Sequence, residues 1–353
     1  MSEEHFYKDG AVIDTRPVAE KLKDYKFEEL VSSAEAVNWT QKTPDQIRKF
    51  PIFDQNGSGS CVAQTGAKEL GIIRSLIDGV YVHFSATDIY QRRINRPTGG
   101  MAGVDVRKII AQGTTLEVLT PSQGMSDSQM DSATVEPYKR EVGKVFIVPN
   151  YVEIAPRNID TIASIIQKTK KGVMVWFYFK YEEWGERPKV LDPNLDLVAP
   201  GTCRHSVTAV DFTLMPDGKK AIVIEDSWGP YAGKGGQRFI DEDFFKARNW
   251  YASYLLQFKF QDPADPTPVK PTYTFNKDLQ FGDVNGDVVA LQDILKYEGF
   301  FPINSQSTGE FGAVTKKAVG QYQLKYGIAL VSSAGYGRVG PKTRAHLNSK
   351  YSA

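Results

Sequence analysis

The stretch DQNGSGSCVAQT, residues 54–65, places a cysteine between a glycine-rich turn and a helical pattern. Apolar residues recur at three- and four-residue spacing through residues 61–78 and predict a helix that begins at Cys61. The amino end of a helix carries about half a positive charge and unpaired N–H groups. Both stabilise a thiolate, the form of cysteine that attacks a carbonyl carbon. The pattern indicates a nucleophile at Cys61, and the alternative is a buried structural cysteine.

A nucleophilic cysteine needs a general base and a donor for the developing oxyanion. His205 lies near the start of an apolar run, CRHSVTAVDF, and Asp226 ends another run, within IEDSWG. Gln55 precedes Cys61 by six residues and offers a side-chain amide toward an oxyanion. We therefore predict a site built from these residues, with a core histidine at a strand end as the alternative for His205.

Between Cys61 and Asp226 the sequence pattern changes from helical spacing to strand-like apolar runs. A second helix is expected around residues 85–93, with Ser85 as its N-cap. Runs rich in Val, Ile and aromatic residues then predict strands, at residues 142–148, 172–179, 206–215 and 220–227. Because the predicted helices come first in the domain and the predicted strands follow, we expect an α+β fold with a helical part and a β-rich part.

A proline-rich segment, QDPADPTPVKPTYT at residues 261–274, predicts an extended linker. It separates a domain at residues 39–260 from a smaller one at residues 275–353. Residues 1–38 are charged and only weakly periodic, so we assign them to an N-terminal extension. That extension is a prosegment, a tail or an extra structural layer.

The smaller domain has an all-helical pattern. Amphipathic stretches cover residues 287–297 and 312–326, and a third runs from Pro341 to Leu347. Proline suits the first turn of a helix, so Pro341 is expected to begin the last one. The three stretches predict a compact three-helix module.

The blocks around Cys61, His205 and Asp226 resemble, in this order, those of papain-like cysteine peptidases. The resemblance spans about residues 38–260 and rests on three short motifs. They are Gln55 with Gly59-Ser60-Cys61 and Ala63, then His205-Ser-Val-Thr-Ala-Val, and then Asp226-Ser-Trp-Gly followed by Gly235-Gly236-Gln237-Arg238-Phe239. It implies that Cys61 is the nucleophile and His205 the general base and acid. Gln55 and the Cys61 N–H would form the oxyanion hole, and Trp228 would shield the third member.

The sequence departs from that family at three positions. Asp226 replaces the family's asparagine, and a carboxylate would stabilise imidazolium more strongly, which would alter the pH profile. Val62 stands where a tryptophan usually follows the cysteine, and Ser58 replaces a disulfide-forming cysteine. Cys203, two residues before His205, should share its face of the strand, either as a plain buried thiol or in a redox role.

Residues 275–348 resemble the three-helix peptidoglycan-binding domain of cell-wall enzymes. The resemblance is carried by the glycines and by the pairs Leu291-Gln292 and Tyr322-Gln323. We expect the core to contain Phe281, Leu291, Leu295, Phe301, Phe311, Val319 and Leu347. Tyr336 and Phe300 are aromatic residues that either stack on sugars or pack internally, and the glycan-binding residues stay unknown.

The composition excludes several classes of protein. With 43 basic and 42 acidic residues the net charge is +1, so nothing indicates a nucleic-acid partner. Two cysteines and four scattered histidines predict neither a disulfide framework nor a metal site, and we expect no cofactor. Residues 283–287 open like a calcium loop, but Val288 and Ile294 stand where glycine and glutamate are required. No apolar run is long enough to cross a membrane.

Together these features predict a cysteine peptidase targeted to the bacterial cell wall, with peptidoglycan peptide or a wall protein as substrate. Alternatives are a general protein-cleaving endopeptidase localised by the wall module, and a non-catalytic structural protein on a papain-like scaffold. The N-terminus lacks a signal-peptide pattern, which fits an endolysin released by phage lysis or an enzyme exported by another route. We expect a monomer.

Overall fold

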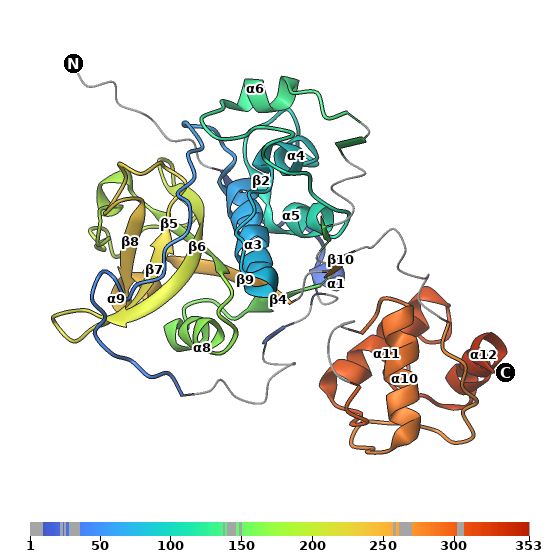
Figure 1. Ribbon diagram of the computed structural model, residues 1–353. Coiled ribbons are helices and arrows are strands. Elements are labelled where there is room, and N and C mark those ends of the chain that lie inside the picture. Colours follow the sequence, from blue (N-terminus) through green and yellow to red (C-terminus); the bar gives the residue numbers. More distant parts are fainter. Residues whose placement is uncertain are drawn as a thin grey trace. The chain divides into compact units, whose positions relative to one another are not determined.

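The computed structural model describes most of the chain. It covers residues 10–21, 24, 26–27, 36–136, 138–139, 146–147, 150–256, 259–260, 270–301 and 307–352. The chain divides into two compact units (Figure 1). The larger unit comprises residues 1–15 and 33–262, and the smaller one residues 16–32 and 263–353. The linker predicted at residues 261–274 lies outside the described residues up to position 269.

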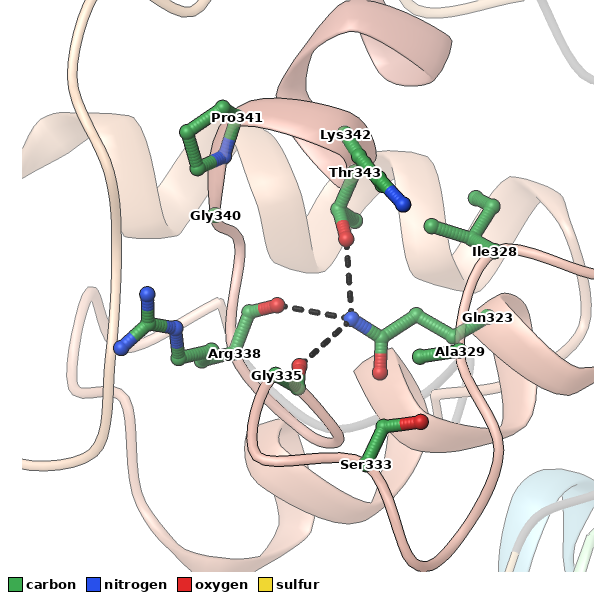
Figure 2. Close-up of a pocket in the computed structure, with 10 residues that line it drawn as sticks. All are labelled: Gln323, Ile328, Ala329, Ser333, Gly335, Arg338, Gly340, Pro341, Lys342 and Thr343. Carbon is green, nitrogen blue, oxygen red and sulfur yellow. Dashed lines mark hydrogen bonds between the residues drawn. The ribbon is translucent and has the colours of Figure 1, made fainter.

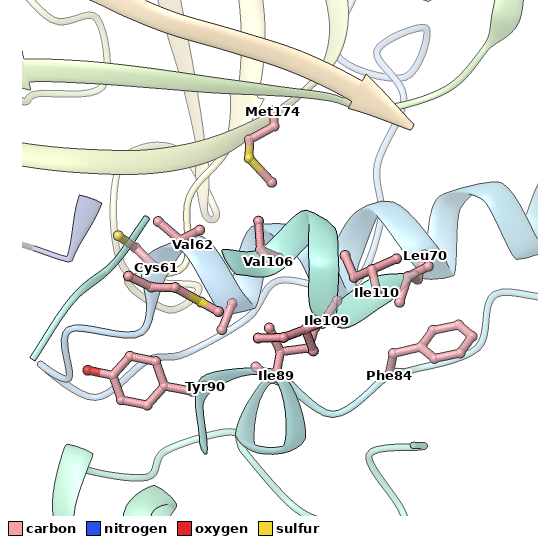
Figure 3. Packing of buried hydrophobic residues seen from close by; sticks show 14 of the residues in the cluster. Cys61, Val62, Leu70, Phe84, Ile89, Tyr90, Val106, Ile109, Ile110 and Met174 are labelled. Carbon is pink, nitrogen blue, oxygen red and sulfur yellow. The ribbon is translucent and has the colours of Figure 1, made fainter. Parts of the chain in front are cut away.

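The first half of the larger unit is helical. Its helices are α3 (Cys61–Asp78), α4 (Ala86–Gln91), α5 (Gly103–Ile110) and α6 (Asp127–Ser132). The long helix α3 has α4 and α5 beside it (Figure 1). Apolar side chains of these helices form one buried cluster with residues of the sheet such as Met174, and Figure 3 shows Cys61 and Val62 among its members. Helix α3 spans the predicted residues, and Ser85 caps α4 by accepting a hydrogen bond from the Asp88 N–H.

The second half is a six-stranded antiparallel sheet with strand order β4-β9-β5-β6-β7-β8. The strands are β4 (Tyr151–Ile154), β5 (Val173–Phe179), β6 (Cys203–Leu214), β7 (Lys220–Glu225), β8 (Gln237–Asp241) and β9 (Asn249–Leu255). Helices α8 (Ile159–Thr169) and α9 (Glu242–Arg248) pack against the sheet, and a short 3-10 helix, η1, covers Tyr181–Glu183. Of the strand predicted at residues 142–148, only β3 (Phe146–Ile147) lies within the described residues, where it pairs with β10 (Lys259–Phe260).

Helix α3 joins the two halves because it packs on strand β6. The Ser206 hydroxyl, next to His205, donates to Thr65 Oγ1 at 3.0 Å. Thr65 Oγ1 in turn donates to the carbonyl oxygen of Cys61 at 2.9 Å. These buried hydrogen bonds fix the first turn of α3 against the strand that carries His205. The α+β fold predicted from the sequence is therefore confirmed.

The smaller unit contains α1 (Val18–Lys21) and the predicted helical module, with α10 (Gly286–Tyr297), α11 (Ala313–Lys325) and α12 (Pro341–Tyr351). Pro341 occupies the first turn of α12, as predicted. Six of the seven expected core residues are buried. Phe281 is the exception: its side chain is 61% exposed, because it lies in a turn before α10 rather than on the inner face of a helix.

No helix among the described residues has the length and apolar character needed to cross a membrane.

Candidate active site

Cys61 is the first residue of α3, and its side chain is fully buried. The preceding loop reaches this position through left-handed backbone at Gly57, with φ of 68°. Gly59 has a different reason to be glycine, since a Cβ there would lie 2.7 Å from the Gly100 nitrogen. Ser60, the N-cap, makes no side-chain capping bond to the first turn. Cys61 therefore lies at the positive end of the helix dipole, a position that generally favours thiolate over thiol.

The loop is also held without the family's disulfide. Ser58 Oγ and Ser60 Oγ lie 2.7 Å apart and share a hydrogen bond, and the Gly59 N–H donates to Asp127 at 2.9 Å. Val62, in place of the usual tryptophan, is fully buried in the helical core (Figure 3). Both departures thus have local packing solutions that leave Cys61 at the helix end.

His205 and Asp226 are brought together by the pairing of β6 and β7. His205 is the third residue of β6, and Asp226 directly follows the last residue of β7. The His205 Nε2–H donates to Asp226 Oδ1 at 2.8 Å, with both side chains buried. An ionised carboxylate only accepts, so this bond places a ring proton on Nε2 and leaves Nδ1 as the ring nitrogen that does not face Asp226.

The pKa of Asp226 reflects two opposing effects. Burial would raise it, but the His205 imidazole and the Arg238 guanidinium outweigh burial and hold the pKa well below its ordinary value. The carboxylate is therefore charged throughout the working pH range and keeps His205 oriented.

An aromatic wall encloses the imidazole. The Trp228 ring centroid lies 4.9 Å from that of His205, and the Trp184 centroid lies 6.0 Å away at a nearly perpendicular angle. Trp184 stacks flat on Phe179, with the centroids 4.1 Å apart. Trp184 and Trp228 are each only 5% exposed, so this wall keeps water from the His205–Asp226 hydrogen bond.

Gln55 is buried beside Ser227, the residue that follows Asp226. Its backbone N–H donates to the Ser227 carbonyl at 2.8 Å, and its Oε1 accepts from the Ser227 hydroxyl at 2.6 Å. Its Nε2 donates one hydrogen to the Ser58 carbonyl at 2.5 Å. These bonds fix the orientation of the amide, and Nε2 carries a second hydrogen beyond the one given to Ser58.

Sequence reasoning missed two residues that contact Asp226. Trp184 Nε1 donates to Asp226 Oδ2 at 2.9 Å, and Arg238 Nε donates to the same oxygen at 2.7 Å. A signal for Arg238 was present, because an arginine inside a buried strand requires an anionic partner. Nothing in the local pattern identified Trp184, which lies 42 residues from Asp226 in the chain.

The N-terminal segment lies directly over Cys61. Strand β1 (Ala11–Val12) pairs in parallel with β2 (Met101–Ala102). A Cβ added to Gly10 would lie 2.5 Å from Cys61 Sγ and 2.6 Å from the Gly59 carbonyl oxygen. The Gly10 carbonyl accepts from the Met101 N–H at 2.8 Å. This backbone covers the thiol, and its carbonyl oxygen is directed to Met101.

Cys203, the first residue of β6, alternates with His205 along the strand and so faces the same side. Neither Cys61 nor Cys203 forms a disulfide.

In the module, a pocket of about 420 Å³ lies at the start of α12 (Figure 2). Gln323 reaches its centre, where the two hydrogens of Nε2 are shared among the Gly335 and Arg338 carbonyls and Thr343 Oγ1. Gln323 Oε1 accepts from the Gly337 N–H at 2.8 Å. Gln292 makes the equivalent bonds, to the Glu310 carbonyl and to Thr315. The glutamines of the two sequence pairs therefore hold loops onto helices.

The aromatic residues considered for sugar stacking also pack internally. Tyr336 lies over Gly320, where a Cβ would come within 2.5 Å of its ring. Phe300 is partly buried against the module core. Their contacts are those of packing residues.

Comparisons with known proteins found matches for the larger domain and for the C-terminal module. The solved structure of xylellain, a cysteine protease from Xylella fastidiosa, matches with a TM-score of 0.52 at 16% identity, over 71% of this chain and 97% of that one. A structure from work on the mite allergens Blo t 1 and Der p 1 matches with a TM-score of 0.50 at 16% identity, over 71% of this chain and 80% of that one. No curated protein sequence matches the chain.

The larger domain thus has the papain-like cysteine protease fold. Residues 284–347 match the family model "Putative peptidoglycan binding domain". The chain combines a papain-like domain with a C-terminal domain of the peptidoglycan-binding family.

Proposed function

We propose that this protein is a cysteine peptidase that hydrolyses peptide bonds at the bacterial cell wall. The observation that carries the proposal is the buried 2.8 Å bond between His205 and Asp226, on a fold that starts a helix at Cys61. The same chain carries a domain of the peptidoglycan-binding family, which would raise the local concentration of wall substrate.

The reaction proceeds through a thioester. The Cys61 thiolate attacks the carbonyl carbon of the scissile bond, and the electron pair of the C=O bond moves to oxygen. Gln55 Nε2 and the Cys61 N–H donate to that oxygen. As the C–N bond breaks, His205 gives its Nδ1 proton to the leaving nitrogen. Water then loses a proton to His205 and attacks the thioester, and Cys61 departs as thiolate.

The enzyme is latent in this form. The backbone at Gly10 occupies the space over Cys61 Sγ that a substrate carbonyl would need. Both polar groups of Gly10 are engaged elsewhere, since its N–H donates to the Arg204 carbonyl and its own carbonyl accepts from Met101. A carbonyl held by Met101 is not delivered to Gln55, so the segment blocks the site without being cut.

The substrate is the peptide part of peptidoglycan or a protein held in the wall. The other candidate with the same chemistry is a general endopeptidase that the module only localises. The inert-scaffold alternative is disfavoured because Cys61 begins a helix and His205 is hydrogen-bonded to Asp226, as the proposed reaction requires.

The test is hydrolysis of isolated peptidoglycan and, separately, of casein, followed as new amino groups. It uses the Gly10→Ala chain, in which the covering segment is displaced, and the same chain with Cys61→Ala. Cys203→Ala is the matched control, because this second cysteine lies on the strand that carries His205.

We expect peptidoglycan cleavage that Cys61→Ala abolishes and Cys203→Ala preserves. Cleavage of casein alone would favour the general endopeptidase. If neither substrate yields new amines, including after proteolytic removal of the N-terminal segment, the inert-scaffold reading replaces the proposal.

A further inference from the structure

Asp226, the partner of His205, carries a negative charge that the family's neutral asparagine would not carry. Asp226 is fully buried beside the imidazole. An uncompensated carboxylate in this position would strongly favour imidazolium, by about 1–3 pH units at contact distance. The chain must either accept that shift or neutralise the charge.

Arg238 supplies the neutralising charge from strand β8. Its Nε donates to Asp226 Oδ2 at 2.7 Å, and the side chain is 5% exposed. Its Nη1 donates to the Trp184 and Gly185 carbonyls at 2.7 and 2.8 Å. The guanidinium carbon lies 5.3 and 5.5 Å from the ring centroids of Trp184 and Trp228. The cation is thus fixed by two carbonyls and lies near both indoles of the aromatic wall.

The two carboxylate oxygens of Asp226 accept hydrogen bonds from different residues. Oδ1 accepts from His205, whereas Oδ2 accepts from Arg238 and Trp184. Donors on both sides hold the carboxylate in one orientation, so Oδ1 is presented to the imidazole. Arg238 therefore acts on His205 through Asp226 and does not touch a substrate.

Two other buried ion pairs lie near Asp226 among the described residues. Lys68 of α3 forms an ion pair at 2.7 Å with Glu225 of β7, the residue directly before Asp226. Arg248 of α9 binds Glu183 of η1 at 2.6 Å. Lys68 also interacts with Asp226 through space, but its ion pair is with Glu225. Arg238 is the cation that contacts Asp226 directly.

We propose that Arg238 is a positioning residue that forms a net-neutral pair with Asp226, so that the pair orients His205 as a neutral amide would. The inference rests on the proposed function, in which His205 exchanges the proton. It replaces the expectation that a carboxylate at position 226 alters the pH profile, because the added charge is balanced locally.

The test follows the titration of His205 in the full chain by NMR with ¹³C-labelled histidine. The signal is assigned by its loss in His205→Gln. Four chains are compared: the unaltered protein, Arg238→Met, Asp226→Asn and the double variant. Titration is read without turnover, so it reports on this inference even if no substrate is cleaved.

We expect Arg238→Met to raise the titration midpoint by about 1–3 pH units, because it leaves the carboxylate unbalanced. Asp226→Asn leaves the guanidinium unbalanced and should lower the midpoint. The double variant should return to within about half a unit of the unaltered protein, because removing both charges again leaves the imidazole beside a neutral pair. In chains that cleave casein, the limbs of the pH–rate profile should move in the same directions.

A merely structural role for Arg238 gives a different pattern. Arg238→Met would then lower thermal stability without moving the midpoint, and the double variant would be the least stable chain. That result would overturn the inference. If Arg238→Met does not fold, Arg238→Lys and the double variant decide: both should match the unaltered midpoint, and a shift of a unit or more in either contradicts the proposal.

Discussion

Two carboxylates, one in each unit, are bound by similar partners and serve different purposes: Asp226 is fully buried and Glu298 is partly buried. Asp226 accepts from His205, Arg238 and Trp184. Glu298, at the end of α10, accepts from Lys325 and Tyr326 at the end of α11 and from Lys350 and Tyr351 of α12. Each acid gathers cations and aromatic donors around a charge that burial alone would disfavour.

The difference lies in what the donors can do. All four donors to Glu298 are lysines and tyrosines, so its network ties the ends of three helices together. One donor to Asp226 is a histidine, which exchanges a proton near neutral pH, and it lies on the strand against which the helix of Cys61 packs. A buried anion with cationic partners is therefore not a site in itself. It becomes one when a proton-exchanging group and a nucleophile share it.

The largest effect expected to separate the two carboxylates is on catalysis. Asp226→Ala should lower kcat/KM on casein by about 10²–10⁴-fold, because His205 loses its orienting partner. Glu298→Ala should leave casein hydrolysis unchanged. Steady-state kinetics in the Gly10→Ala background measure both values. Equal losses in the two variants would mean that Asp226 acts only by stabilising the fold.

The second largest effect is expected from a change in residues 10–12, the segment that covers Cys61. Gly10→Ala places a methyl group against Cys61 Sγ and a backbone oxygen, and overpacking of this kind costs about 1–3 kcal/mol. Casein hydrolysis by the full chain should therefore rise by about ten-fold. Thr15→Ala, at an exposed position of the same segment, is the control. Unchanged or lower activity in Gly10→Ala would show that the segment does not limit the enzyme.

The smallest effect concerns the module. Burial would raise the pKa of Glu298, but Lys350, Tyr326, Tyr351 and Lys325 lower it to about 2. A carboxyl whose folded-state pKa is depressed contributes stability above its unfolded pKa, about 4.3, and this stability is lost as the pH falls toward 2. Glu298→Gln should cost about 1–3 kcal/mol at pH 7 and remove most of this acid sensitivity.

Hydrogen exchange of the α10–α12 amides in the full chain measures that change. Asp293→Asn is the matched control, because Asp293 lies on the same helix and is half exposed. If Glu298→Gln matched the control between pH 7 and 3, the Glu298 network would not hold the module together.

The sequence predicted the parts of the fold that depend on local pattern. Helix α3 begins at Cys61 and α12 at Pro341 because turn chemistry and apolar spacing are local. The order in which the strands pair was not predictable from such patterns, because pairing depends on contacts distant in sequence. Phe281 was misassigned for a related reason: an aromatic residue in a turn has no periodicity that reveals its exposure.

The site was predictable only as far as its motifs extend. Cys61, His205, Asp226, Gln55 and Trp228 lie in short recognisable blocks, and the structure brings His205 together with Asp226 and Trp228. Arg238 and Trp184 meet at Asp226 only because β8 and the segment after β5 converge there. The path of residues 10–12 over the thiol likewise has no local signal, since it depends on pairing with Met101.

The central claim is that Cys61 is a reactive thiol whose reactivity depends on His205 and that the N-terminal segment covers this thiol. Alkylation by iodoacetamide tests it directly, with the rate at Cys61 measured by peptide mapping between pH 5 and 9 and Cys203 as the internal reference. In Gly10→Ala, Cys61 should react rapidly down to pH 5 and far faster than in the unaltered chain, and His205→Gln should abolish this reactivity. If Cys61 reacts only above about pH 8, as an ordinary thiol does, the account is contradicted.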